Sequence, residues 1–475
     1  MDGILYLIPV LLPMIAGGCI LALRPKKSAE LSFLTAVLTA LTVWLPRMTD
    51  GTVQLYFTGN LSFDLNLDPL AGFFLILITV GFGLAVLYAR EYLGREEKRH
   101  RFFGFALLTL GSMVGLAMAG NILTFYMFYE MMSLLSFPLV LYSGEEKARK
   151  AAMSYLGFSV FGASLALCGI FLAGQLSLFP FRVNAQQTDP DGMMQAAFLL
   201  MMLGFSCKAG MMPLANWLPT AHPVAPAPAS ALLSGIITKA GILGMIRTAY
   251  FMFGASNMAG TFAQKVLLTL SIVTVFCGSM LAYKEKLLKK RLAYSSVSQI
   301  SYVIFGLMLL THGGLEAGLM QVAFHACAKV GLFLCAGAFI HHCNANYVDE
   351  LTGMGRRMPV VMACFTCFSL SLVGIPPFGG FVSKWLLAGA ALDEGSVFAQ
   401  AGVVVLMISA LLTAGYLLPI VARGYFPGEG REYKKTDAGA AMAVPLVFLA
   451  VLAAVLGLFP GRLQELFRLI TSYIY

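Results

Sequence analysis

Long apolar runs separated by short polar segments recur along the whole chain. A membrane-spanning helix needs about 20 consecutive, mostly apolar residues, so this pattern predicts about fourteen such helices. Two runs are interrupted, one by Pro213 and Pro219 and the other by the segment 375–380, Ile-Pro-Pro-Phe-Gly-Gly. Because proline lacks a backbone N–H and bends or ends a helix, we expect two broken helices inside the membrane. The predicted spans are 3–23, 29–46, 69–89, 102–119, 121–142, 152–174, 194–218, 226–250, 265–283, 291–310, 313–342, 358–391, 398–425 and 440–460.

The composition leads to the same class of protein. Hydrophobic residues make up 59% of the 475 residues, and charged residues only 12%. Such a chain has too few polar side chains to cover several separate cores in water. We therefore expect an all-α integral membrane protein surrounded by the lipid bilayer. A soluble dehydrogenase, a protein with a nucleic-acid partner and a secreted scaffold are all disfavoured.

Basic residues gather in alternate loops between the predicted spans, and they account for the formal net charge of +9. Loops rich in Lys and Arg stay on the cytoplasmic side of a membrane. The asymmetry holds only if the number of spans is even, so we expect both termini on the non-cytoplasmic side. One set of loops carries Arg24, Lys26, Lys27, Arg90, Arg95, Lys98, Arg99, Arg101, Lys147, Arg149, Lys150, Lys284, Lys286, Lys289, Lys290, Arg291, Arg356, Arg357, Arg423, Arg431, Lys434 and Lys435, and the other carries only Arg47, Arg182, Arg247 and Lys265.

Nothing in the sequence indicates a bound metal or cofactor. Among the nine cysteines, only Cys364 and Cys367 have the C-x-x-C spacing. They lie inside a predicted span with no second pair nearby, so we expect inert thiols rather than a metal or iron–sulfur site. A glycine-rich dinucleotide loop is also missing from the sequence. We expect no cofactor, no metal and no redox centre on this chain.

Six of the ionisable side chains inside the predicted spans carry the main argument, because a central Lys or Asp costs about 2.5–3.5 kcal/mol there. They must be paired, hydrated or neutral. Lys208 precedes the first break and Lys384 follows the second, an arrangement found at ion sites in transporters. His325 and Lys329 are four positions apart and share one helix face. The six residues are Glu130, Lys208, Lys239, His325, Lys329 and Lys384.

Burial favours the neutral form of a lysine, whereas a facing carboxylate favours the charged form. A buried lysine that loses its acidic partner can therefore release a proton, and this set of residues predicts proton transfer through the membrane interior. Each lysine could instead be structural, reaching the interface or neutralising a helix C-terminus. His222, beside Pro223, either admits protons or supports the broken helix. Ser295 and Gln299 either hold water beside the ionisable groups or join helices by hydrogen bonds.

These residues lie in motifs that resemble the antiporter-like subunits shared by respiratory complex I, multi-subunit cation/proton antiporters and energy-converting membrane-bound hydrogenases. The most diagnostic stretch has a Lys, a broken helix, an AH-x-x-AP turn and a second Lys. The resemblance implies two inverted five-helix repeats, each with a broken helix. It divides the chain into 1–101, a first repeat 102–250 with its break near 208–219, a second repeat 265–425 with its break near 374–384, and a last helix with a short tail, 440–475. The matching motifs are FYMFYEMMSLLSFPLVLYSG, KAGMMPLANWLPTAHPVAPAPASALLSGIITKAGILG, KRLAYSSVSQISYV, AFHACAKVGLFLCAGAFIH and GIPPFGGFVSKW.

The resemblance also implies roles. Glu130 and Lys208 would form a coupling ion pair, Lys239 and the helix of His325 would relay protons, and Lys384 would be the terminal site. Other membrane subunits and a hydrophilic redox arm would supply the energy in a prokaryotic plasma membrane. We expect a proton-translocating subunit of a redox-driven complex of the hydrogenase or NADH:quinone oxidoreductase type. A subunit of a Na⁺/H⁺ antiporter without a redox partner is the alternative.

Overall fold

The computed structural model describes the chain except residues 1, 49–52, 59–60, 177–179, 182–188 and 427–434. Arg182, Arg431 and Lys434 of the predicted loop charges lie outside the described residues. Within them, twelve helices are long and apolar enough to cross a membrane. Helix α13 is as long but more polar, and the broken pair α16 and α17 supplies one further crossing, which gives the fourteen expected. The all-α membrane class is confirmed.

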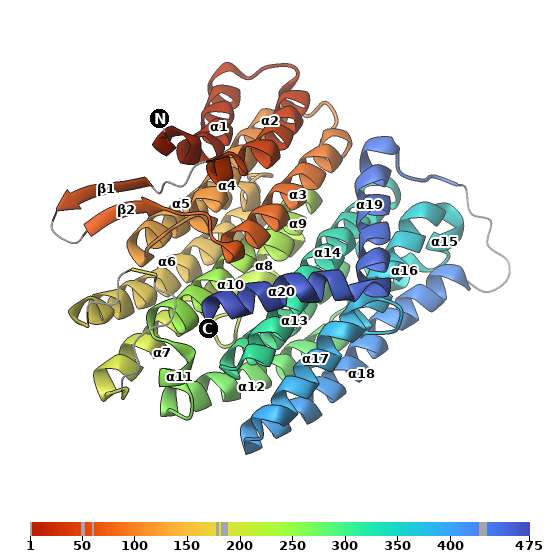
Figure 1. Ribbon diagram of the computed structural model, residues 1–475. Helices are drawn as coiled ribbons and strands as arrows, with labels where there is room; N and C mark the ends of the chain where they lie inside the picture. Colours follow the sequence, from red (N-terminus) through yellow and green to blue (C-terminus); the bar gives the residue numbers. More distant parts are fainter. Residues whose placement is uncertain (1, 49–52, 59–60, 177–179, 182–188, 427–434) are drawn as a thin grey trace.

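The structure is built almost entirely of helices, with one small hairpin (Figure 1). Most helices lie side by side, whereas α20 crosses the bundle. The elements are α1 Asp2–Leu23, α2 Ser28–Thr42, the 3-10 helix η1 Leu45–Met48, β1 Val53–Thr58, β2 Leu61–Leu65, α3 Pro69–Tyr92, α4 Arg99–Ala117, α5 Ile122–Val140, α6 Glu146–Gln175, α7 Gly192–Ala209, α8 Trp217–Val224, α9 Ala227–Leu232, the π-helix η2 Leu233–Ile237, α10 Thr238–Ile246, the π-helix η3 Arg247–Met252, α11 Ala255–Met258, α12 Phe262–Lys284, α13 Leu288–Met308, α14 His312–Cys343, the 3-10 helix η4 Val348–Leu351, α15 Met354–Arg357, α16 Pro359–Val373, α17 Gly379–Glu394, α18 Val397–Tyr425, α19 Ala440–Leu458 and α20 Pro460–Ile474.

Small residues let α6 and α7 approach each other closely. A Cβ atom added at Gly204 would lie 2.6 Å from the carbonyl oxygen of Gly162 and 2.5 Å from the backbone nitrogen of Ala166. Side chains larger than glycine are therefore excluded here, and the two backbones are nearly in contact, as is common between membrane helices. This contact brings the first turns of α6 beside the C-terminal end of α7, where Lys208 lies.

Both expected breaks are present, and the two preceding half-helices end in the same way. Gly210 ends α7 with φ 97° and Gly374 ends α16 with φ 89°, a left-handed conformation that glycine adopts without strain. The N–H groups of Gly210 and the next residue both donate to the carbonyl of Ser206, and those of Gly374 and the next residue both donate to that of Leu370. The first break is narrower than predicted, because Pro219 lies inside α8.

Two elements at one end of the bundle were not predicted. Strands β1 and β2 pair antiparallel, with Leu55 opposite Phe63. The expected C-terminal tail instead folds as the amphipathic helix α20, and its buried Phe467 packs edge-on against Phe73 at 4.8 Å between ring centroids. An isolated amphipathic segment is too short and too polar to be recognised as a span, which is why the hydrophobic pattern missed it.

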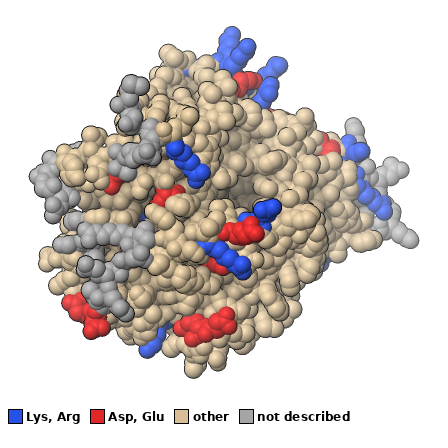
Figure 2. Space-filling model, in the orientation of Figure 1, with Lys and Arg blue, Asp and Glu red and all other residues tan. Residues whose placement is uncertain are grey.

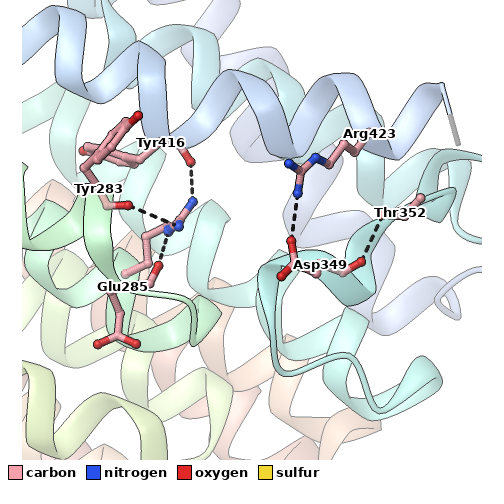
Figure 3. A network of polar contacts seen from close by, with 7 residues as sticks. Tyr283, Glu285, Asp349, Thr352, Tyr416 and Arg423 are labelled. Atoms are coloured by element: carbon pink, nitrogen blue, oxygen red, sulfur yellow. Dashed lines mark hydrogen bonds and ion pairs between the residues drawn. The ribbon is translucent and has the colours of Figure 1, made fainter.

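Basic side chains stand out along the upper and right edges of the bundle (Figure 2). Figure 3 shows the polar contacts that join the end of α12, η4 and α18. Arg291 donates to the carbonyls of Glu285 at 2.6 Å and of Tyr416 at 2.9 Å, and Arg423 forms an ion pair with Asp349 at 2.8 Å. Partial burial raises the pKa of the Glu285 carboxyl, but hydrogen bonds from Lys290 and nearby backbone N–H groups outweigh it and lower that pKa.

Candidate functional site

Four of the six predicted residues are almost completely buried. Lys208, Lys239, His325 and Lys329 are each 0–1% exposed, whereas Glu130 and Lys384 are partly buried. An ammonium group so far from water needs several hydrogen-bond acceptors. The partners of each group therefore decide what the group can do.

Lys208 lies among hydroxyl groups and aromatic rings. Its Nζ donates to the Tyr155 hydroxyl at 2.9 Å and to Ser159 Oγ at 2.8 Å, both on α6. The amine also lies 4.3 Å from the centroid of the Tyr155 ring and 5.9 Å from that of Trp217. A hydroxyl can both donate and accept, so these neighbours can hydrogen-bond the charged and the neutral form of the amine. Sequence reasoning missed Tyr155 and Ser159, although their spacing of four residues places them on one helix face.

The expected ion pair between Glu130 and Lys208 is not formed in this structure. Glu130 accepts a hydrogen bond from the Tyr126 hydroxyl at 3.0 Å, and no contact of 4.0 Å or less joins its carboxylate to a cation among the described residues. Helix α5 instead reaches Lys208 through Ser136, whose Oγ lies 2.6 Å from the Tyr155 hydroxyl. The coupling role of Glu130 stays a prediction.

Lys239 and His325 meet at the centre of the protein. Lys239 Nζ lies 2.8 Å from His325 Nδ1 and donates to the carbonyl of Ser234 at 2.7 Å. The lysine directly follows the π-helix η2, a local widening that is frequent at functional sites. Two basic groups at this distance share one hydrogen bond, so a proton on either group can pass to the other.

Lys329 has a different partner from His325, although both lie on α14. Its Nζ donates to the carbonyl of Leu292 on α13 at 3.0 Å. Of the three basic groups expected at the centre, the structure thus joins Lys239 to His325 directly and holds Lys329 one turn further along α14.

A small enclosed cavity separates His325 from Lys384. The volume open to the centre of a water-sized sphere is about 10 Å³, close to what a single water molecule needs. His325 Nε2 and Gln299 Nε2 are buried and have no hydrogen-bond partner among the described residues. The cavity is lined by Gln299, Gln321, Phe324, His325, Ser371, Leu372, Gly380 and Lys384.

Gln321 and Ser383 complete the polar wall beside this cavity, and sequence reasoning missed both. Ser383 Oγ donates to Gln321 Oε1 at 2.6 Å, and Gln321 Nε2 donates to Gln299 Oε1 at 3.1 Å. The available signal was spacing, because Gln321, His325 and Lys329 follow one another at intervals of four along α14.

Lys384 lies on α17, and its side chain reaches the C-terminal end of α16, the other half of the same broken helix. Its Nζ donates to the carbonyls of Leu372 at 2.6 Å and of Val373 at 2.8 Å, in the last turn of α16. These carbonyls have no partner within the helix because the chain turns away after Gly374. The amine also lies 5.3 Å from the centroid of the Tyr302 ring.

The polar residues of α13 contact different neighbours. Gln299 lines the cavity, whereas Ser295 accepts from the Tyr416 hydroxyl at 2.7 Å, and Ser298 lies 2.8 Å from Ser279. Ser295 forms the interhelical hydrogen bond that was one of its two alternatives.

The His222 ring is fully buried and stacks on Phe333 with 4.5 Å between centroids, and neither ring nitrogen has a partner among the described residues. Its backbone carbonyl accepts a hydrogen bond from Ser230 Oγ at 3.1 Å. Its support of the broken helix stays a prediction. A role in admitting protons stays a prediction.

The charge pattern placed Arg247 in a loop, but the structure places it in the π-helix η3. It is 2% exposed and forms a buried ion pair with Asp68. Its guanidinium also lies 4.5 Å from the centroid of the Phe251 ring and 5.1 Å from that of Phe181. A guanidinium with a carboxylate and two rings is a structural pairing that joins α3 to η3.

The chain is similar to known membrane proteins in sequence and in fold. The family described as NADH:quinone oxidoreductase/Mrp antiporter, transmembrane, matches residues 119–413. NADH-quinone oxidoreductase subunit N of Desulforudis audaxviator is 31% identical over 417 residues, 83% of this chain and 82% of that protein. Na(+)/H(+) antiporter subunit A1 of Staphylococcus haemolyticus is 31% identical over 435 residues, 86% of this chain and 53% of that protein. A chain in the solved structure of respiratory complex I from Thermus thermophilus with bound NADH is 25% identical, with a TM-score of 0.83 over 99% of this chain and 100% of that one.

Proposed function

Because this chain belongs to the NADH:quinone oxidoreductase/Mrp antiporter transmembrane family, we propose that it translocates protons along its buried basic residues as a subunit of a redox-driven membrane complex. The observation that carries the proposal is the direct contact of 2.8 Å between Lys239 and His325, with a water-sized cavity leading on to Lys384.

The proposed route has three parts. Lys208 exchanges a proton with the hydroxyl groups of Tyr155 and Ser159, to which its amine is hydrogen-bonded. Lys239 passes a proton to His325. A water molecule in the cavity then joins the second nitrogen of His325 to Lys384. The route runs through groups that are nearly all buried, so an arriving charge at one of them disfavours the charge at the next.

The energy source lies outside the chain. A hydrophilic redox arm and neighbouring membrane subunits drive the charge shifts, in a complex of the hydrogenase or NADH:quinone oxidoreductase type in a prokaryotic plasma membrane. Both termini face the non-cytoplasmic side, which is supported by the alternation of basic loops. Glu130 responds to the neighbouring subunit and changes the charge that Lys208 experiences.

The alternative, a Na⁺/H⁺ antiporter subunit without a redox partner, is favoured by one observation. Antiporter subunit A1 of Staphylococcus haemolyticus is as similar to this chain, at 31% identity, as subunit N of NADH-quinone oxidoreductase from Desulforudis audaxviator. The buried groups suit either system, because both move protons through the same kind of site.

The test is made on the affinity-tagged chain purified gently with its partners, identified by mass spectrometry and reconstituted in vesicles. Co-purified hydrogenase or iron–sulfur subunits, with donor-driven internal acidification that Lys208→Ala abolishes, are the expected result. Recovery of small membrane subunits alone, with exchange driven by an imposed Na⁺ gradient, would establish the antiporter. Normal acidification by a complex carrying Lys208→Ala would mean that this chain is a scaffold.

A further inference from the structure

A second pocket lies far from the proton route, at the end of the bundle where the basic loops gather. It opens between the first turns of α4 and the last turn of α5, and its volume is about 250 Å³. That volume is close to the lower limit of ligand pockets, about 300 Å³. Three cations and three apolar side chains make up most of its wall: Lys98, Arg101, Arg149, Phe105, Pro138 and Leu141.

The three cations have no acidic partner. No ion pair or side-chain hydrogen bond involves Lys98, Arg101 or Arg149 among the described residues. Basic residues nearby do have partners, as Lys150 has in Glu146 at 2.7 Å. Three like charges around one pocket repel one another, so the arrangement suits a bound anion.

One acidic side chain beside the pocket is already engaged. Glu96 accepts a hydrogen bond from the Tyr142 hydroxyl at 2.6 Å, and Tyr142 also lines the pocket. This bond keeps the phenol at the pocket wall and directs the Glu96 carboxylate to Tyr142 rather than to the three cations.

The pocket changes character with depth. Arg101 lies in the first turn of α4, and Phe105 lies one turn deeper on the same face. Pro138 and Leu141, at the end of α5, continue the apolar wall. A cationic rim above an apolar wall matches an amphiphile with an anionic head, whereas a soluble anion makes no use of the apolar part.

We propose that this pocket binds the phosphate headgroup and first acyl carbons of an anionic phospholipid. Arg101 and Arg149 bind the phosphate oxygens, because a guanidinium can donate two parallel hydrogen bonds to them. Lys98 adds a third charge at the rim, and Phe105 contacts the acyl chain. The proposal concerns lipid binding alone and stands whether or not the protein moves protons.

The experiment uses the purified complex that contains this chain, stripped of lipid in neutral detergent. Dioleoyl-phosphatidylglycerol or dioleoyl-phosphatidylcholine is then added, and the midpoint of thermal unfolding and the lipid retained in native mass spectrometry are measured. Phosphatidylglycerol is expected to bind and to stabilise the complex, whereas phosphatidylcholine is not. Combining Arg101→Gln with Arg149→Gln should weaken phosphatidylglycerol binding about 25-fold, since each basic residue near a membrane surface contributes about a factor of five.

The matched control combines Lys27→Gln with Lys147→Gln, which removes the same charge from the same end of the protein outside the pocket. Both residues are exposed, and so are Arg101 and Arg149, so both double variants should fold. If the control and the pocket variant lose phosphatidylglycerol binding equally, binding depends on the general surface charge rather than on the pocket, and the proposal is overturned. Displacement of the lipid by millimolar inorganic phosphate would also overturn it, in favour of a soluble anion. Crosslinking of an acidic partner segment to the pocket would assign the site to that partner instead.

Discussion

The two half-helices before the breaks, α7 and α16, end in the same type of turn at a left-handed glycine. The lysines beside the two breaks nevertheless have different neighbours. Lys208 precedes its break and binds the hydroxyls of Tyr155 and Ser159 on another helix. Lys384 follows its break and binds the carbonyls of Leu372 and Val373 at the end of α16. The two sites therefore differ in the chemistry of their acceptors rather than in the backbone that presents them.

This difference bears on what the loss of each ammonium group would leave behind. A hydroxyl can turn and donate or accept, whereas a carbonyl can only accept. We therefore expect the hydroxyls around Lys208 to find other partners, and the two carbonyls at Lys384 to be left without a donor.

The largest expected effect comes from replacing each lysine by methionine. Lys208→Met and Lys384→Met should both reduce proton translocation more than tenfold, because neither site can then carry a proton. Stability should separate them. Lys384→Met leaves two buried carbonyls unbonded, at about 1–3 kcal/mol each, whereas the hydroxyls around Lys208 can bond elsewhere.

Internal pH in vesicles and the thermal unfolding midpoint measure these two quantities. The control is Lys265→Met, at an exposed lysine near the start of α12. Equal losses of stability at both breaks would contradict the distinction between hydroxyl and carbonyl acceptors.

A smaller effect should separate the two tyrosines beside these lysines. Tyr155→Phe removes the hydroxyl that binds Lys208 but keeps its ring, and a lost hydrogen bond to a charged group corresponds to about a tenfold lower rate. Tyr302→Phe is the matched control, because the Tyr302 hydroxyl donates to the carbonyl of Leu406 rather than to Lys384. Its transport rate should stay close to that of the natural chain. Comparable loss of transport in both variants, measured as initial rates in vesicles, would mean that the hydroxyl at Lys208 has no special part.

The smallest effect should be a difference in stability between the two glycines. Gly210→Ala and Gly374→Ala each force alanine into the left-handed region, at a cost of about 1 kcal/mol. The Cβ at position 210 would also lie 2.3 Å from Leu218 Cδ1, whereas at position 374 the nearest atom is Lys384 Cδ at 3.1 Å. Gly210→Ala should therefore lower the unfolding midpoint more.

Gly157→Ala serves as the control, since a Cβ there meets nothing within 4 Å and the residue lies inside α6. A larger loss at position 374 than at position 210 would show that the second break is the more tightly constrained.

The spans and both breaks could be predicted because hydrophobic length and proline act locally. The candidate lysines could be found because a charge inside an apolar run is conspicuous in any sequence. Their partners could not be found in the same way. The contacts of Lys208 with Tyr155 and of Lys384 with Leu372 depend on helices that meet only after folding.

The remaining errors have the same origin. The partners of Ser295 and Gln299 could not be predicted, because α13 is surrounded by other helices and its polar residues bind different neighbours. Arg247 was read as a loop charge because its buried partner Asp68 is 179 residues away. The helix α20 is stabilised by contacts such as that between Phe467 and Phe73, which no local pattern contains.

The most direct test of the whole account is the number of protons translocated per electron, or per Na⁺ in an antiporter, by complexes carrying His325→Asn. Asparagine keeps an acceptor beside Lys239 but has no second nitrogen to reach the cavity, so the complex should assemble. The account predicts that the contribution of this chain disappears while the driving reaction continues. An unchanged ratio in a fully assembled complex would contradict transfer through the contact between Lys239 and His325.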